Sequence, residues 1–145
     1  MTITVGNMTP LFQVYDVRKS VAFYSKTLGF EVTETYEPDG HLYWTKLTHG
    51  DVTLMLNAAW EDDERPDKLD EDRIRAHGDT ELYFQCDDVD SLYDNLKRAG
   101  ANIGSPQEQH GRREIVLYDP DGYKLAFTQP KPLADAPQAG RSTGP

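Results

Sequence analysis

The sequence predicts an α+β protein built from two βαβββ modules, and an internal repeat is the first reason. FQVYDV at residues 12–17 and FQCDDV at residues 84–89 share Phe, Gln, Asp and Val in register, 72 residues apart. The second reason is that each segment is followed by a helix-like stretch ending in glycine, and then by three short β-like runs. A repeated supersecondary unit of this kind determines the fold class.

Both expected helices have a capping residue, an apolar face and a terminal glycine. Asp16 is the expected N-cap of the first helix, and Gly29 can take the left-handed position after its end. In the second helix Asp88 and Gly100 have the same two roles. The apolar faces consist of Val17, Val21, Tyr24 and Leu28 in the first helix and Val89, Leu92, Leu96 and Ala99 in the second.

Three β-like runs follow each helix, and turn-forming residues separate them. The turns of the first module fall at residues 38–40 and 49–51, and in the second module Asp-Pro-Asp-Gly at residues 119–122 predicts a tight turn. The expected strands cover residues 31–37, 41–47, 51–57, 101–104, 113–119 and 123–129.

Acidic residues outnumber basic ones and are concentrated between the modules. The 145 residues include 25 Asp and Glu against 15 Lys and Arg, a net charge of −10. Residues 61–72 hold eight acids and two bases, which we interpret as a solvated acidic loop with a basic shoulder at Arg73 and Arg75. The expected organisation is a first module over residues 1–60, an acidic linker over 61–79, a second module over 80–129 and a disordered tail over 130–145.

Composition excludes several classes of protein. A strongly acidic chain repels a phosphate backbone, so nucleic acid is not an expected partner. The single cysteine, Cys86, cannot form an internal disulfide, which favours a reducing compartment. No apolar run approaches the roughly 20 residues that span a membrane, and the first ten residues lack the pattern of a secretory signal. We therefore expect a cytoplasmic protein with a small-molecule partner.

Alternation along the first strand of each module indicates where a ligand could bind. Apolar side chains share one face, which should meet the helix. The opposite face mixes polar and apolar side chains in both modules, which suits a concave surface that touches a ligand; an ordinary half-exposed sheet explains the same pattern. These mixed faces comprise Thr9, Leu11 and Gln13 in the first module and Glu81, Tyr83 and Gln85 in the second.

Three segments carry a family resemblance. VRKSVAFYSKTLGF (17–30), DDVDSLYDNLKRAGA (87–101) and YDPDGYKLAF (118–127), together with the paired βαβββ modules, resemble the vicinal oxygen chelate superfamily of glyoxalase I, extradiol dioxygenases and bleomycin-resistance proteins. The chain is most similar to the bleomycin-resistance-like branch. The resemblance implies an open, cup-shaped mixed sheet, usually completed in a homodimer, and by itself implies no chemistry.

The resemblance also locates the positions that bind metal in the superfamily's metalloenzymes, where His, Gln and Glu are the usual ligands. These positions fall on Thr9, on Met55 or Leu54, on Glu81 and on Ala126. Only Glu81 is a competent ligand, and one ligand of four cannot hold a catalytic ion. We therefore expect no metal cofactor, and Glu81 is the one candidate catalytic residue.

The four histidines fall at turns or loop edges and form no ligand-like pair. His110 is distinctive, because HGRREIVLYDP (110–120) resembles stretches that line the pocket mouth in the bleomycin-resistance-like branch. On that resemblance His110, Arg113 and Glu114 are candidate ligand contacts. The alternative is that the arginines pair with Glu114 on an exposed strand.

Aromatic rings near the expected cup could stack on a planar ligand. Trp44, Trp60, Tyr83 and Phe127 are the candidates, although Trp44 and Phe127 could equally belong to the core. Among such rings Glu81 would be partly desolvated, which would raise its pKa or require a cationic partner. Both outcomes favour a positively charged or amide-bearing ligand.

Two functions from different classes follow. The first is a metal-free binding protein, a homodimer that sequesters a flat natural product, which can be cationic, and so confers antibiotic resistance. The second is an enzyme, a lyase or isomerase of the lactoylglutathione lyase type that uses Glu81 or an unconventional metal site. The candidate ligand-binding residues are Thr9, Gln13, Trp44, Met55, Trp60, Glu81, Tyr83, His110, Arg113 and Phe127.

Overall fold

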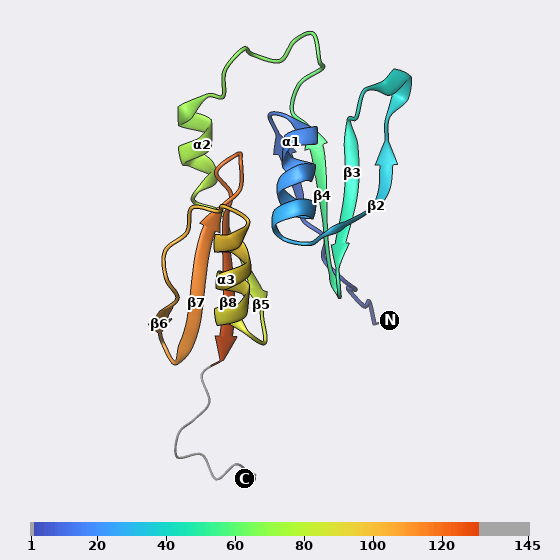
Figure 1. Ribbon diagram of the computed structural model, residues 1–145. Coiled ribbons are helices and arrows are strands. Elements are labelled where there is room, and N and C mark those ends of the chain that lie inside the picture. Colours follow the sequence, from blue (N-terminus) through green and yellow to red (C-terminus); the bar gives the residue numbers. More distant parts are fainter. Residues whose placement is uncertain (1, 131–145) are drawn as a thin grey trace. The chain divides into compact units, whose positions relative to one another are not determined.

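The computed structural model describes residues 2–130, so the tail expected from residue 130 onward lies, beyond Pro130, outside the described residues. The described residues form two compact units. Unit 1 comprises residues 2–80 and 118–124, and unit 2 comprises residues 81–117 and 125–130. Each unit contains its own four-stranded sheet (Figure 1).

Unit 1 is a βαβββ module, as the sequence predicts. Its elements are β1 (Leu11–Val14), α1 (Val17–Ala22), β2 (Glu31–Tyr36), β3 (Trp44–His49) and β4 (Val52–Ala58). A π-helical turn, Phe23–Thr27, extends α1. The sheet has the order β1-β4-β3-β2 and is mixed: β1 runs parallel to β4, whereas β3 is antiparallel to β4 and β2.

Unit 2 repeats this topology. Its elements are β5 (Glu81–Gln85), α3 (Val89–Arg98), β6 (Gln107–Gln109), β7 (Arg112–Tyr118) and β8 (Lys124–Pro130). The strand order is β5-β8-β7-β6, which matches unit 1 position by position. The two-module α+β fold is therefore confirmed.

The capping residues have their expected roles. Asp16 Oδ1 accepts a hydrogen bond from the Lys19 N–H at 3.2 Å, and Asp88 Oδ1 accepts one from the Ser91 N–H at 3.0 Å. The hydrogen bonds from Ser91 also lower the pKa of Asp88, because they stabilise its charged form. After the helices, Gly29 and Gly100 have positive φ angles, 82° and 85°.

The strand expected at residues 101–104 is wrong, and the strand of this region is β6, farther along the chain. The Ala101 N–H donates to the Leu96 carbonyl at 2.9 Å, so this stretch completes the end of α3. Ile103 is buried in the core of unit 2. The expected apolar face of α3 is also one residue too long, because the helix ends at Arg98 and Ala99 is exposed.

Part of the acidic stretch is helical rather than a solvated loop. Residues Glu71–His77 form α2, which begins at the N-cap Asp70. Glu71 and Asp72 lie in its first turn and Arg75 and His77 in its last turn, an order that complements the helix dipole. Counting charges over residues 61–72 conceals this order, because the count ignores position along the helix.

The core of each unit lies between its sheet and its helices. In the described residues no helix is long and apolar enough to cross a membrane. The buried apolar side chains of unit 1 include Phe12, Val14, Val17, Tyr24, Leu28, Phe30, Leu47, Leu54 and Leu56, and those of unit 2 include Phe84, Val89, Leu96, Ile115, Leu117, Leu125 and Phe127.

The tight turn after β7 contributes a buried polar cluster to unit 1. Tyr24 donates its hydroxyl proton to Asp119 Oδ2 at 2.7 Å, and Asp119 Oδ1 accepts the N–H groups of Asp121 and Tyr123. Asp121 in turn accepts a hydrogen bond from the Tyr15 N–H at 2.8 Å. The Tyr24 side chain and the Tyr15 backbone, on either side of α1, thus hold the turn in place.

Ring stacking attaches the same turn to β1 and α2. The Tyr123 ring lies 4.1 Å from Phe12 and 4.0 Å from His77, nearly parallel to both. His77 Nδ1 lies 2.7 Å from the Asp121 carbonyl oxygen. The sequence predicts only a tight turn here. In the structure this turn makes contacts with β1, with α2 and with the segment around α1, so it is a central part of the packing of unit 1.

Candidate functional site

The side of the unit 1 sheet that faces away from α1 carries a set of accessible side chains, which we call the open face. Along β1 and β4, buried residues such as Phe12 and Leu56 alternate with accessible ones. The helix α1 covers the buried side (Figure 1). The open face comprises Leu11, Gln13, Glu34, Tyr36, Trp44, Lys46, Met55 and Asn57.

Strand register arranges the open face into two adjacent rows. In the first row Gln13 lies opposite Asn57, Asn57 opposite Trp44, and Trp44 opposite Tyr36, so the row crosses all four strands. The Asn57 amide donates to Gln13 Oε1 at 3.2 Å. This row therefore presents two aromatic rings beside a pair of amides.

The second row runs alongside it. Leu11 lies opposite Met55, Met55 opposite Lys46, and Lys46 opposite Glu34. Lys46 Nζ and Glu34 Oε2 are 3.6 Å apart, so the charges at this end of the row compensate each other. The other end is apolar, and 41% of Leu11 is exposed.

Three of the candidate residues from the sequence lie together on the open face: Gln13, Trp44 and Met55. Thr9 lies just before β1 and is exposed. The next residue, Pro10, accepts the Met55 N–H through its carbonyl oxygen at 2.9 Å, so Thr9 is at the margin of the second row.

Trp60 follows β4 and lies in neither row. The Arg73 guanidinium is 4.9 Å from the centre of its ring, and the Tyr15 ring meets it edge-on at 6.2 Å. These contacts give Trp60 a structural role at the start of the linker.

In unit 2, Glu81 and Tyr83 share the side of β5 that faces away from the core, and 61% of Tyr83 is exposed. Glu81 is exposed as well. On the neighbouring strands Arg112 Nε donates to Thr128 Oγ1 at 2.6 Å, which makes this part of the sheet polar.

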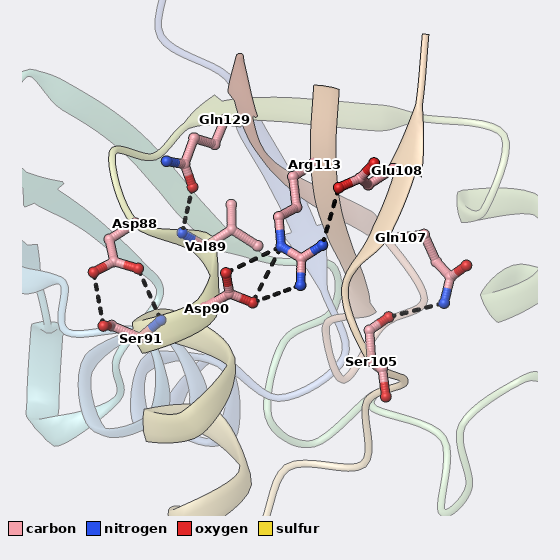
Figure 2. A network of polar contacts seen from close by, with 9 residues as sticks. All are labelled: Asp88, Val89, Asp90, Ser91, Ser105, Gln107, Glu108, Arg113 and Gln129. Atoms are coloured by element: carbon pink, nitrogen blue, oxygen red, sulfur yellow. Dashed lines mark hydrogen bonds and ion pairs between the residues drawn. The ribbon is translucent and has the colours of Figure 1, made fainter. Parts of the chain in front are cut away.

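Phe127 and Arg113 lie on the other side of the unit 2 sheet, which carries the core and α3. The Phe127 ring stacks on Phe84 at 4.8 Å within the core. The core is the second of the two positions that the sequence allows for this residue. Arg113 contacts Asp90 at the start of α3, with nitrogen–oxygen distances of 2.8–3.1 Å, and Glu108 at 3.5 Å (Figure 2). The hydrogen bonds to Asp90 raise the pKa of Arg113, because they stabilise its charged form. The charge of Arg113 is therefore compensated by carboxylates of unit 2.

Other residues also make polar contacts at the start of α3. Gln129 Oε1 accepts the Val89 N–H at 2.9 Å, and Asp88 accepts both the N–H and the hydroxyl of Ser91 (Figure 2). These contacts satisfy N–H groups that the helix itself leaves open. The sequence allows an ion pair between Arg113 and Glu114 as an alternative, but the partners of Arg113 in the structure are Asp90 and Glu108.

His110 forms the tip of the β6–β7 hairpin. It has a φ of 52°, Gly111 follows with 74°, and His110 is exposed. Two successive positive φ angles are typical of a type I′ hairpin turn. The backbone conformation accounts for this position without a ligand.

The positions that bind metal in related metalloenzymes do not fit a divalent ion here. Thr9 offers a hydroxyl, Met55 a thioether and Ala126 a buried methyl group, which leaves the Glu81 carboxylate as a hard anionic donor. Within residues 2–130, no three His, Cys, Asp or Glu side chains gather as a metal site would require.

Together these features define a class: a protein of two βαβββ modules with a partly aromatic sheet face and no conventional metal-binding set. Residues 8–127 match the Glyoxalase/Bleomycin resistance protein/Dioxygenase superfamily, and the chain belongs to this family. A lactoylglutathione lyase of Neisseria meningitidis serogroup A is 31% identical over 130 residues, which cover 83% of this chain and 88% of the relative.

Solved structures share the fold. TnmS3, an antibiotic binding protein from Streptomyces sp. CB03234, has a TM-score of 0.67 at 22% identity, with 90% of this chain and 100% of that chain covered. The bleomycin-binding protein of Streptomyces verticillus complexed with copper(II)-bleomycin has a TM-score of 0.63 at 21% identity, with 90% and 100% covered. At these identities the likeness shows the fold alone.

Five residues of the open face are absent from the candidate ligand-binding residues that the sequence suggests: Leu11, Glu34, Tyr36, Lys46 and Asn57. Three of them carry a signal, because each is two residues from a candidate on its own strand and so shares its side: Leu11 with Gln13, Lys46 with Trp44 and Asn57 with Met55. Glu34 and Tyr36 carry no such signal, since their positions beside Lys46 and Trp44 follow from the pairing of β2 with β3.

Proposed function

We propose that the protein is a metal-free binding protein that sequesters a flat, cationic natural product of the antibiotic type. The observation that carries this proposal is the first row of the open face, in which Tyr36 and Trp44 lie beside the amides of Asn57 and Gln13. Two accessible rings beside a hydrogen-bonding pair suit an aromatic ligand with polar substituents.

The second row supplies apolar contact. Leu11 and Met55 can pack against the body of a ligand whose ring system stacks on Trp44, and the methionine side chain adapts to different shapes. Sequestration requires affinity and no turnover, which agrees with the poor metal-binding set. The fold relatives described as antibiotic-binding and bleomycin-binding support the same class of function.

Overall charge favours a cationic ligand. A net charge of −10 attracts cations over distances of about 10 Å at moderate ionic strength and so raises their encounter rate. We further propose that two copies associate in the cytoplasm, because related proteins of this fold usually complete their clefts as homodimers.

Ligand binding is expected to quench Trp44 fluorescence. The experiment uses the Trp60→Phe protein, in which Trp44 is the remaining tryptophan, and titrates it with bleomycin and with planar aromatic cations such as ethidium. We expect saturable quenching, and Trp44→Ala is expected to weaken binding by about tenfold, measured by calorimetry, because a buried aromatic contact is lost.

The Trp60→Phe protein is also the matched control for affinity, since Trp60 is outside both rows and its replacement should leave calorimetric binding unchanged. Absence of saturable quenching up to millimolar concentrations of every probe would contradict the proposal. Equal loss of affinity in Trp44→Ala and Trp60→Phe would place the ligand elsewhere.

A second candidate function is an enzyme of the lactoylglutathione lyase type, which the 31% identical Neisseria relative favours. In that case Glu81 would act as a general base or as a ligand of an unconventional metal site. Turnover to lactoylglutathione, with stoichiometric metal that is lost in Glu81→Ala, would establish this function and overturn the first.

A further inference from the structure

Unit 1 contains a cavity of about 380 Å³ that is separate from the open face. Its lining residues come from the start of α1, the end of β4 and the connection between β2 and β3. The first residues of the acidic linker complete its wall. Its volume lies within the range of small-molecule sites, and none of the open-face residues lines it.

The charge of this cavity is opposite to that of the chain. Arg18, Lys19 and Arg65 line it together with two acids, Asp16 and Asp62, although acidic residues outnumber basic ones by 25 to 15 in the sequence. The cavity therefore concentrates positive charge in a protein that is otherwise strongly negative.

Both acids are already engaged. Asp16 caps α1 by accepting the Lys19 N–H at 3.2 Å. Asp62 pairs with His41, and Arg65 Nη1 lies 3.5 Å from Asp62 Oδ1. Arg65 therefore offsets part of the charge of Asp62, and the Asp16 carboxylate is held at the start of α1.

The cations differ in how far they are engaged. Arg18 pairs with Glu37 and donates to the Gly40 carbonyl at 3.1 Å. Lys19 is exposed, and within residues 2–130 its ammonium group makes no hydrogen bond or ion pair. Lys19 is thus the group best able to bind a new anion.

Apolar side chains supply the rest of the lining. Val17 is buried, and Ala22, Leu42 and Ala58 are half-buried at the cavity. A ligand that fits this combination has one anionic group and a compact apolar body.

We infer that this cavity binds a small organic anion, with a carboxylate or phosphate group on Lys19 and an aromatic or aliphatic body against Val17, Leu42 and Ala58. The site is independent of the proposed binding on the open face, which favours a cation. The protein would then have two binding sites of opposite charge preference on one module.

NMR titration of the ¹⁵N-labelled full chain tests this inference. Phenyl phosphate and benzoate are the anionic probes, and benzylammonium is the cationic probe of similar size. We expect both anions to shift the amide signals of residues 16–22, 40–42 and 58 in a saturable way, with millimolar dissociation constants, and benzylammonium to leave them unchanged. Comparison of the two anions identifies which anionic group is preferred.

Two variants make the test specific. Lys19→Gln is expected to weaken anion binding about fivefold, because one charge-assisted contact is lost. Ala22→Leu is expected to abolish binding without a change of charge, because the larger side chain fills the cavity. The matched control is Lys26→Gln, which removes an exposed lysine from the same helical segment but not from the cavity.

Equal weakening in Lys19→Gln and Lys26→Gln would overturn the inference, because it would show attraction to net charge alone. Shifts centred on the open face, or equal binding of benzylammonium, would overturn it as well. Trp44 quenching by cationic ligands should be unchanged in Lys19→Gln, so failure of one proposal is distinguishable from failure of the other.

Discussion

Replacement of Gly122 by alanine is expected to destabilise the protein by at least about 3 kcal/mol, the largest loss expected for alanine at any glycine of residues 2–130. A Cβ at this position would lie 2.3 Å from the carbonyl oxygen of Ile74 and 2.9 Å from its carbonyl carbon. Both are backbone atoms of α2, so the clash cannot be relieved by a change of rotamer. The free energy of unfolding from urea denaturation measures the loss.

Gly40→Ala is the matched control for this substitution. Gly40 has a φ of 80°, close to the 89° of Gly122, but a Cβ there would meet nothing within 4 Å. We expect a loss of about 1 kcal/mol, which is the ordinary cost of a left-handed alanine. A difference of less than about 1 kcal/mol between the two variants would contradict the tight packing of α2 against the turn.

The second large effect is an unusual dependence of stability on pH, which originates at Asp119. This carboxylate is 5% exposed, and burial raises its pKa from 3.8 to about 6. Between these two values the folded state binds a proton that the unfolded state does not. Stability therefore increases as the pH falls from 7 towards 4, by up to about 3 kcal/mol from this group.

Measurement of unfolding free energies between pH 7 and pH 4.5 in wild type and in Asp119→Asn tests this. The amide does not titrate, so we expect the gain on acidification to be smaller in the variant, although Asp121, whose pKa burial also raises, retains its own contribution. The control is Asp67→Asn, an exposed residue of the linker that should keep the wild-type slope. Identical slopes in all three proteins would contradict a buried, titrating Asp119.

Tyr24→Phe tests the same buried cluster by removing the hydroxyl group that donates to Asp119. The Tyr24 hydroxyl donates to Asp119 and stabilises its charged form, so its removal should raise the pKa of Asp119 further. We expect a loss of about 2–4 kcal/mol at pH 7, where a buried carboxylate has lost a donor, and a smaller loss at pH 5. Tyr36→Phe, on an exposed tyrosine, should change stability little at either pH.

Much of the fold could be predicted because its signals are local. The repeat of FQ-x-x-D-V, the N-caps Asp16 and Asp88 and the glycines after each helix all act within a few residues of their own positions. The start of α2 has a local signal of the same kind, the N-cap Asp70. The net charge of the acidic stretch does not reveal this helix, because it contains no information on the order of the charges.

The candidate site could be predicted only in part. Gln13 follows from alternation along its strand, Trp44 from the aromatic rings near the expected cup and Met55 from the family resemblance, and the structure brings the three onto one face. Arg113 in β7 and Phe127 in β8 do not lie on an open face. They lie on the side of the unit 2 sheet that carries the core and α3. Arg113 is a candidate through the resemblance and Phe127 through its aromatic ring, and neither signal determines on which side of a strand the residue lies.

The sequence by itself determined the two βαβββ modules, because residue types and short spacings carry that information, and its motifs carry the resemblance that the family match confirms. Only the tertiary structure decided that Tyr36, Trp44, Asn57 and Gln13 form one row, and that the turn at residues 119–123 is buried in unit 1. Both depend on register and packing between segments far apart in the chain, and no local pattern contains that information.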